Sequence, residues 1–186
     1  MRGITVLRLG HRLHRDFRIT THCALVARAL GASAMIIAGD RDDDIIKGIQ
    51  RVNRAWGGDF QIEYRKEWRA LINRWASRAD ALVILATMYG VNLLDVTKRL
   101  RKESAEKEIL LIIGSEKMPA EVFHLADLNV AVSNQPHSEV AAVALILEKI
   151  FGSRTLKRSF EGRTYEVVPR SSGKQVKGVR DSDLRE

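Results

Sequence analysis

Arginine and histidine side chains are concentrated in one short segment near the N-terminus. Residues 8–22 carry four arginines and three histidines: Arg8, Arg12, Arg15, Arg18, His11, His14 and His22. A guanidinium group binds phosphate oxygens and stabilises a developing oxyanion, and an unperturbed imidazole exchanges a proton near neutral pH. No cysteine and no pair of carboxylates accompanies the three histidines, and the arginines would repel a cation. The pattern therefore does not indicate a metal site. The segment is a candidate for phosphate binding and proton transfer.

Three polar loops, each following a mostly apolar run, form the second group of candidates. The runs at residues 81–86, 108–113 and 128–132 are typical of strands buried on both faces. The loops that follow them are Thr87-Met88-Tyr89-Gly90, Gly114-Ser115-Glu116-Lys117 and Ser133-Asn134-Gln135-Pro136-His137. Because the carboxyl ends of parallel strands meet at one edge of a sheet, we expect the three loops to converge on a single ligand crevice.

Signatures of three common catalytic folds are absent from the chain. It has no GxxxxGKS/T of a P-loop nucleotidase, no GxGxxG after the first predicted strand, and no GxSxG elbow of a hydrolase. These three classes therefore have no support in the sequence.

Strand and helix patterns alternate along the first 151 residues. Strands are predicted at residues 4–9, 34–38, 60–64, 81–86, 108–113 and 128–132, with helices between them. Thr20 or Thr21 is expected to cap the first helix, and the last helix is expected to run from Ser138 to Phe151. The alternation predicts an α/β fold with a mostly parallel sheet flanked by helices. Because the last helix is apolar on nearly every side, it also suggests a partner subunit.

The C-terminal segment differs in character from the rest. Residues 156–160 and 163–168 are predicted to pair as a β-hairpin around Glu161-Gly162. The sequence therefore divides into a domain at residues 1–152, a hairpin extension at 153–169 and a flexible basic tail at 170–186.

Positive charge is concentrated at the two ends of the chain. The 186 residues carry a formal net charge of +8, to which residues 1–31 contribute +5 and residues 151–186 contribute +4. Basic ends on a nearly neutral centre indicate a polyanionic partner and favour a nucleic acid. The single cysteine, Cys23, cannot form an intrachain disulfide, and no apolar run is long enough to cross a membrane. We expect a soluble, cytoplasmic protein without a membrane partner.

Four stretches of the sequence carry a family resemblance. They are RLGHRLHRDFRITTH at residues 8–22, TMYG at 87–90, IIGSEKMP at 112–119 and NVAVSNQPHSEVAA at 129–142. Together they resemble the archaeal tRNA cytidine-56 2'-O-ribose methyltransferases of the SPOUT (SpoU-TrmD) superfamily, which modify the T-loop of tRNA. The resemblance implies a SPOUT-type fold with a C-terminal trefoil knot, S-adenosyl-L-methionine as methyl donor, tRNA as substrate, no metal, and a homodimer paired partly through the hairpin.

The resemblance also implies which residues hold the methyl donor. They are the end of the strand before Tyr89, the turn that matches the second SPOUT motif, and the segment that matches the third: Leu85, Ala86, Thr87, Gly114, Ser115, Glu116, Lys117, Met118, Val132, Ser133, Asn134, Gln135, Pro136, His137, Ser138 and Glu139.

The first motif departs from the wider superfamily. SpoU-type enzymes carry an arginine inside the first helix, and alignment at Gly31 places Leu25 at that position. The subfamily's own motif instead implies a catalytic arginine among Arg8, Arg12, Arg15 and Arg18, with Arg18 preferred. An arginine would stabilise the developing alkoxide and fix the adjacent phosphate, because its pKa above about 12 opposes a role as base. His11 or His22 is the alternative base, and simple phosphate binding is the alternative role of each arginine.

Two other functions are compatible with these features. One is 2'-O-methylation of another tRNA or ribosomal RNA ribose, and the other is a non-catalytic, dimeric RNA-binding protein.

The charge distribution predicts that binding of tRNA depends steeply on salt. Each phosphate neutralised by lysine or arginine releases counterions, so raising the salt from about 50 to 200 mM should weaken binding at least roughly a hundredfold. Filter-binding isotherms across a potassium chloride series measure this slope. Isotherms that do not shift with salt would contradict the assignment of the basic ends to RNA.

Overall fold

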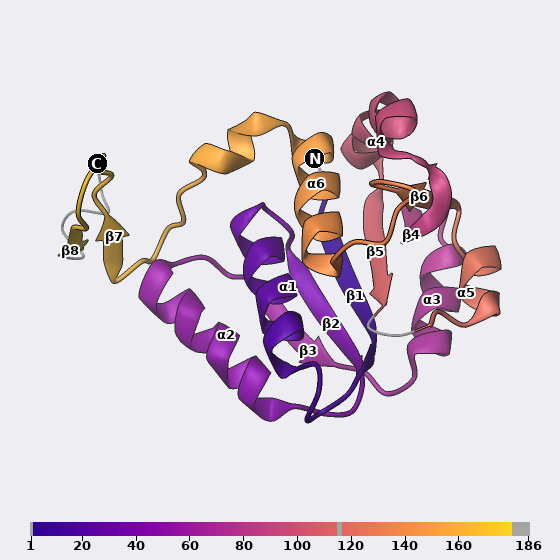
Figure 1. Cartoon of the computed structure of the whole chain (residues 1–186), viewed down its shortest axis with the longest axis horizontal. Coiled ribbons are helices and arrows are strands. Elements are labelled where there is room, and N and C mark those ends of the chain that lie inside the picture. Colours follow the sequence, from indigo (N-terminus) through magenta and orange to yellow (C-terminus); the bar gives the residue numbers. More distant parts are fainter. Residues whose placement is uncertain (1, 115–116, 180–186) are drawn as a thin grey trace.

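Six strands form one sheet in which every neighbouring pair is parallel (Figure 1). The computed structural model describes residues 2–114 and 117–179. The strands are β1 Ile4–His11, β2 Ala34–Gly39, β3 Gln61–Tyr64, β4 Ala81–Asn92, β5 Glu108–Gly114 and β6 Leu128–Ala131, in the spatial order β3-β2-β1-β5-β4-β6. The predicted α/β fold with a parallel sheet is confirmed.

Helices cover both faces of this sheet (Figure 1). They are α1 Phe17–Ala29, α2 Asp43–Trp56, α3 Trp68–Ala76, α4 Leu93–Glu106, α5 Ala120–Leu125 and α6 Glu139–Phe151. The larger core cluster joins one face of the sheet to α1, α2, α4 and α6, and the smaller cluster joins the opposite face to α3 and α5. Coverage on both faces explains why the central strands are continuous apolar runs.

Helix α1 begins at Phe17, three or four residues before the caps that the sequence suggests. Thr20 and Thr21 lie inside the helix, so the prediction that one of them caps it is wrong. The Thr20 side chain is buried against β1, where its hydroxyl accepts a hydrogen bond from Arg8. A tertiary contact therefore uses the hydroxyl that a local cap would have needed, and Arg18 falls in the first turn of the helix.

Strand β4 continues well beyond the apolar run that predicts it. Both Ala86 and Val91 pair with Val130 of β6, so the residues between them bend out and return to the same strand. At Gly90 a Cβ atom would lie 2.4 Å from the carbonyl carbon and oxygen of Asn129. Only glycine fits such an approach between two backbones.

The C-terminal hairpin consists of other residues than the sequence suggests. Residues 156–160 are not a strand, because Ser153–Lys157 forms a 3₁₀-helix (η1). Strand β7, Tyr165–Val167, pairs instead with β8, Val176–Gly178, in an antiparallel ladder. The predicted flexible tail thus contributes a strand at 176–178, and its residues 180–186 lie outside the described part of the chain.

Docking of Phe160 onto the domain explains this difference. The guanidinium carbons of Arg28 and Arg158 lie 4.3 and 5.4 Å from the centroid of its ring. The backbone amide of Gly58 also donates to the carbonyl of Glu161 over 2.8 Å. Because this stretch is held against the end of α2, it is not available as a hairpin strand, and the hairpin lies beyond α2 in Figure 1.

Replacement of Gly90 by alanine should destabilise the fold. The added methyl group would meet backbone atoms, which cannot rotate away, and we expect the free energy of unfolding to fall by about 1–3 kcal/mol. Urea denaturation measures the change. The control is Gly178→Ala, where no atom of the described residues lies within 4 Å of the added carbon. Equal stability of the two variants would contradict the close approach at Gly90.

Candidate functional site

The three polar loops meet at the carboxyl edge of the sheet, because β5, β4 and β6 are neighbours. The side-chain amide of Asn134 donates to the carbonyl oxygens of Met88 and Gly90, over 2.7 and 3.2 Å. These bonds fasten the loop after β6 to the bend in β4. The loop after β5 starts at Gly114, which pairs with Leu9 of β1.

Two adjoining cavities open between these loops. Both are lined by Ala86, Thr87 and Gly114. The smaller cavity has a volume of about 240 Å³ and the larger about 530 Å³, sizes that suit parts of one small-molecule ligand. Their shared wall places a single crevice at the edge where the sequence predicts one.

The predicted donor-binding residues fall into three groups. Those that line a cavity are Ala86, Thr87, Gly114, Lys117, Met118, Val132, Gln135, Pro136, His137 and Glu139. Those that line neither cavity are Leu85, Ser133, Asn134 and Ser138. Leu85 is fully buried in the core, and the Ser138 hydroxyl caps α6 by accepting from the amide of Val140 over 3.2 Å. Ser115 and Glu116 lie outside the described residues.

Aromatic side chains complete the larger cavity, and those of α5 lie outside the loops that the sequence analysis singled out. Phe123 and His124 come from α5, and Tyr89 comes from the bend in β4. The rings of Tyr89 and Phe123 lie 6.3 Å apart between centroids. The signal was present, since α5 directly follows a predicted ligand loop, but only the fold shows that this helix returns over the crevice.

Arg8 differs from the other arginines of the segment because its side chain is completely buried. Its side chain lies in β1 with 0% exposure, and its Nε donates to the Thr20 hydroxyl over 2.7 Å. Its Nη1 is 3.8 Å from a carboxylate oxygen of Glu139. Neither Nη atom has a hydrogen-bond partner in the described part of the chain. Such a side chain cannot contact RNA directly.

His11 is also buried, which removes it as a base for a substrate in solvent. Its Nδ1 lies 2.9 Å from the Thr20 hydroxyl oxygen, and its Nε2 lies 3.5 Å from Asp42. Asp42 in turn caps α2 by accepting from the amides of Asp44 and Ile45. His11 therefore joins β1 to α1 and α2.

Arg12 holds the turn before α1 together. Its Nε and Nη2 donate to the two carboxylate oxygens of Asp16 over 2.9 and 3.2 Å, and its backbone amide donates to the same group. The hydrogen bonds from the Arg12 side chain hold the pKa of Asp16 below its ordinary value. Arg12 thus shapes the arginine-rich segment.

Arg15, Arg18 and His22 remain exposed. Arg18 and His22 are four residues apart in α1, so they lie on the same side of the helix. Cys23, the next residue, is buried, and this burial raises the pKa of its thiol to about 11. Its sulfur is therefore protonated at neutral pH. The exposed side chains of this segment that can carry a positive charge are arginines and histidines.

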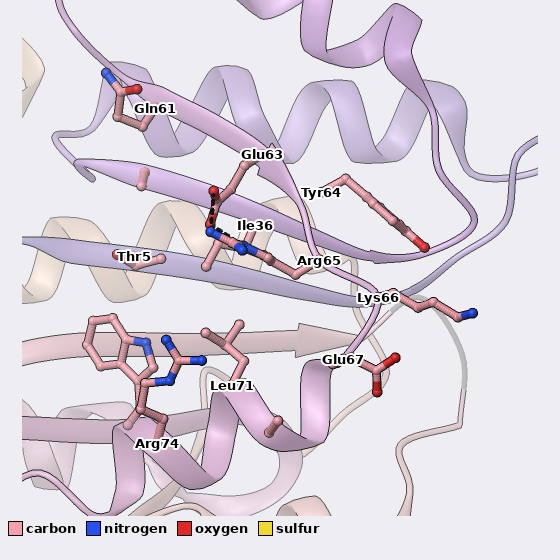
Figure 2. Close-up of a pocket in the computed structure, with 13 residues that line it drawn as sticks. Thr5, Ile36, Gln61, Glu63, Tyr64, Arg65, Lys66, Glu67, Leu71 and Arg74 are labelled. Carbon is pink, nitrogen blue, oxygen red and sulfur yellow. Dashed lines mark hydrogen bonds and ion pairs between the residues drawn. The ribbon is translucent and has the colours of Figure 1, made fainter.

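A larger cavity lies elsewhere, between β2, β3 and α3 (Figure 2). Its volume is about 720 Å³, and Leu71 and Arg74 of α3 face Ile36 and Glu63 of the sheet across it. Arg65 is paired there with Glu63 through two hydrogen bonds of 3.0 and 3.1 Å. None of the predicted site residues lines this cavity, so it is not part of the crevice at the loops.

Two further features of the described residues concern metals and membranes. Within residues 2–114 and 117–179, no group of three or more histidine, cysteine, aspartate or glutamate side chains is placed to hold a metal ion. In the same ranges no helix combines the length and the apolar character needed to cross a membrane.

Comparison with known proteins gives close matches along the chain. The family model of tRNA ribose 2'-O-methyltransferase, aTrm56, matches residues 56–177. The tRNA (cytidine(56)-2'-O)-methyltransferase of Thermococcus kodakarensis is 43% identical over 174 residues, which cover 93% of this chain and 96% of the relative. The protein of the same name from Methanopyrus kandleri is 47% identical over 171 residues, which cover 92% and 94%.

Solved structures of lower sequence similarity share the fold. The SpoU methyltransferase AviRb from Streptomyces viridochromogenes, in complex with the cofactor AdoMet, matches with a TM-score of 0.57 at 18% identity, over 82% of this chain and 58% of that one. The TrmH/SpoU tRNA modifying enzyme of A. aeolicus matches with a TM-score of 0.59 at 13% identity, over 84% and 78%. This chain spans little more than half the length of AviRb. At these identities the matches show the fold alone.

The Arg12–Asp16 pair predicts a pH-dependent effect of Asp16→Asn. Because the pKa of Asp16 is lowered on folding, the pair stabilises the protein above the ordinary carboxyl value of 3.8, and this stability is lost as the pH falls below it. At pH 7 the variant should lose about 1–2 kcal/mol of unfolding free energy in urea titrations. The gap between variant and wild type should narrow at pH 3.

The matched control is Glu63→Gln, which removes an equally bidentate but exposed pair with Arg65. Its effect on the free energy of unfolding should be much smaller than that of Asp16→Asn at both pH values, because water screens exposed ion pairs. A pH-independent loss in Asp16→Asn would contradict the role assigned to the Asp16 charge.

Proposed function

Because this chain belongs to the tRNA ribose 2'-O-methyltransferase family, we propose that it methylates the 2'-oxygen of cytidine 56 in the T-loop of tRNA. The observation that carries this proposal is one crevice, lined by Ala86, Thr87 and Gly114, at the sheet edge where β1 ends and the arginine-rich segment passes into α1. A methyl donor in the crevice and an RNA phosphate at the arginines would meet at this edge.

S-adenosyl-L-methionine fits the residues of this crevice. Small and apolar walls, among them Gly114, Ala142 and Val132, let backbone groups approach a ligand closely. The rings of Tyr89 and Phe123 offer flat surfaces for a purine base. When bound, this cofactor supplies an electrophilic methyl group on a positively charged sulfur.

The chain's own residues would orient the reaction and stabilise its charges. Gly114, Met118 and the cavity-lining residues of the loop after β6 would hold and orient the donor; these loop residues are Val132, Gln135, Pro136 and His137. Transfer of that methyl group to the ribose 2'-oxygen would require the hydroxyl proton to leave, so a residue of this chain would accept it. A cation beside that oxygen lowers the energy of the developing alkoxide.

Arg18 is the arginine best placed for that role. It is exposed in the first turn of α1, no ion pair joins it to any described residue, and Thr20 of the same helix reaches the end of β1. Arg15 is exposed in the preceding turn and suits an adjacent phosphate. His22, on the same side of α1 as Arg18, is the candidate acceptor of the 2'-hydroxyl proton.

A trefoil knot and a homodimer belong to the same proposal. The pairing of Val130 with both Ala86 and Val91 supports a chain threaded through the bend of β4. In α4 and α6, which pack against each other, Leu94 is 71% exposed and Leu145 is 43% exposed. A second copy covering these leucines would supply the apolar surroundings that α6 lacks.

Basic residues of the C-terminal extension would lengthen the contact with tRNA. Lys157 and Arg158 are exposed after α6, whereas Arg163 is paired with Glu166 over 3.2 Å. We therefore assign phosphate contact to the first two and hairpin support to Arg163.

Methyl transfer to a full-length tRNA transcript tests the proposed function. With tritiated donor, label should appear in wild-type transcript at cytidine 56 and be absent from a transcript with 2'-deoxycytidine at that position. Label at another ribose would replace the proposed specificity with another RNA target. Binding of tRNA without any transfer would favour a non-catalytic RNA-binding protein.

Arg18→Ala should slow the chemical step without weakening donor binding. Loss of one charge-stabilising group at a reacting oxygen costs about 100-fold or more in rate. Single-turnover methylation measures the rate, and calorimetry should show donor affinity within about twofold of wild type. Arg51→Ala, an exposed arginine of α2, is the control. An undiminished rate in Arg18→Ala would remove Arg18 from the catalytic site.

A further inference from the structure

A row of polar side chains runs from α2 through β1 and α1 to α6, behind the smaller cavity. Its members, in spatial order, are Asp42, His11, Thr20, Arg8 and Glu139. The first four are buried, whereas the Glu139 side chain is 30% exposed and lines the cavity. The row therefore ends in a carboxylate that a ligand in the cavity can reach.

Glu139 is the charge that balances Arg8. A guanidinium is charged at every physiological pH, and a buried charge without a counter-charge is strongly unfavourable. Among the described residues, the nearest carboxylate to Arg8 is that of Glu139, yet the two atoms are 3.8 Å apart, beyond the roughly 2.7–2.9 Å of a charge-assisted hydrogen bond. Glu139 is attracted to Arg8 while its oxygens accept no hydrogen bond from any described residue.

Among the described residues, no other carboxylate lines the smaller cavity. Its remaining described walls are apolar or neutral side chains and Gly114, apart from the imidazole of His137. In such surroundings one carboxylate strongly favours a cationic group of the ligand over a neutral one.

We propose that Glu139 provides the counter-charge for the sulfonium of the methyl donor and that Arg8 is the positioning residue that holds Glu139 in place. This inference rests on the proposed function. Arg8 spans two helices, because its Nε is fixed on Thr20 of α1 while its Nη1 faces Glu139 at the start of α6. After methyl transfer the sulfur is neutral, so the attraction ends and release of the product is favoured.

Calorimetry with S-adenosylmethionine and S-adenosylhomocysteine on the full chain tests this role. The two compounds share an ammonium group, and only the first carries the positive sulfur. Glu139→Gln should weaken binding of S-adenosylmethionine at least about tenfold and that of S-adenosylhomocysteine less than about twofold. Glu148→Gln, on the same helix and paired with Lys149, is the control and should change neither affinity.

Variants of Arg8 separate positioning from stability. Glu139→Gln leaves Arg8 without its counter-charge, so the thermal unfolding midpoint of this variant should fall below that of the wild type. The double variant Arg8→Met, Glu139→Gln removes both charges, so its thermal unfolding midpoint should return most of the way to the wild-type value. Its preference for S-adenosylmethionine over S-adenosylhomocysteine should remain lost. Arg8→Lys keeps the charge but lacks the forked guanidinium that reaches both Thr20 and Glu139. This variant should lower the preference for S-adenosylmethionine over S-adenosylhomocysteine about threefold.

Three outcomes would contradict, respectively, the role of Glu139, the assignment to the sulfonium and the proposed function. A folded Glu139→Gln protein with an unchanged preference overturns the role of Glu139. Equal weakening of both compounds assigns the carboxylate to the ammonium group and overturns the sulfonium assignment. Absence of S-adenosylmethionine binding to the wild-type chain overturns the proposed function itself.

Discussion

Gly90 lies against the backbone of Asn129 and Val130 so closely that no side chain fits there, and the crevice depends on this contact. It lets β4 bend outward after Ala86 and return to β6 at Val91. The bend presents two carbonyl oxygens, those of Met88 and Gly90, to the side-chain amide of Asn134. The loop after β6 is thereby held beside the bend, and the two cavities open against Gly114.

Burial assigns different tasks to arginines that are close in sequence. Arg8 lies inside the protein, where its charge is balanced by Glu139 at the wall of the smaller cavity. Arg12 lies at the boundary with solvent and closes the turn before α1 by holding Asp16. Arg18 faces solvent at the start of α1, where RNA can reach it. The same charged group serves packing, loop geometry and proposed catalysis because the surrounding dielectric and the available partners differ.

The C-terminal extension gains its order from the domain. Two three-residue strands would be marginal as an isolated hairpin in water. Phe160 between two arginines, and backbone bonds from the end of α2 to residues 161 and 164, fix the approach to β7. The extension therefore forms part of the domain surface, and its basic residues keep a defined position relative to α2.

Sequence patterns by themselves determined the alternation of strands and helices, the buried central strands and the three ligand loops, because periodicity and loop composition are local properties. The family also followed from local motifs, among them GSEKMP and SNQPHSEV. Tertiary structure decided the beginning of α1, since the Thr20 hydroxyl binds Arg8 instead of capping the helix. It decided the hairpin partner as well, because Phe160 docks on Arg28. It also decided which arginines reach solvent, because burial depends on contacts among residues that are far apart in the chain, such as Arg8 and Glu139.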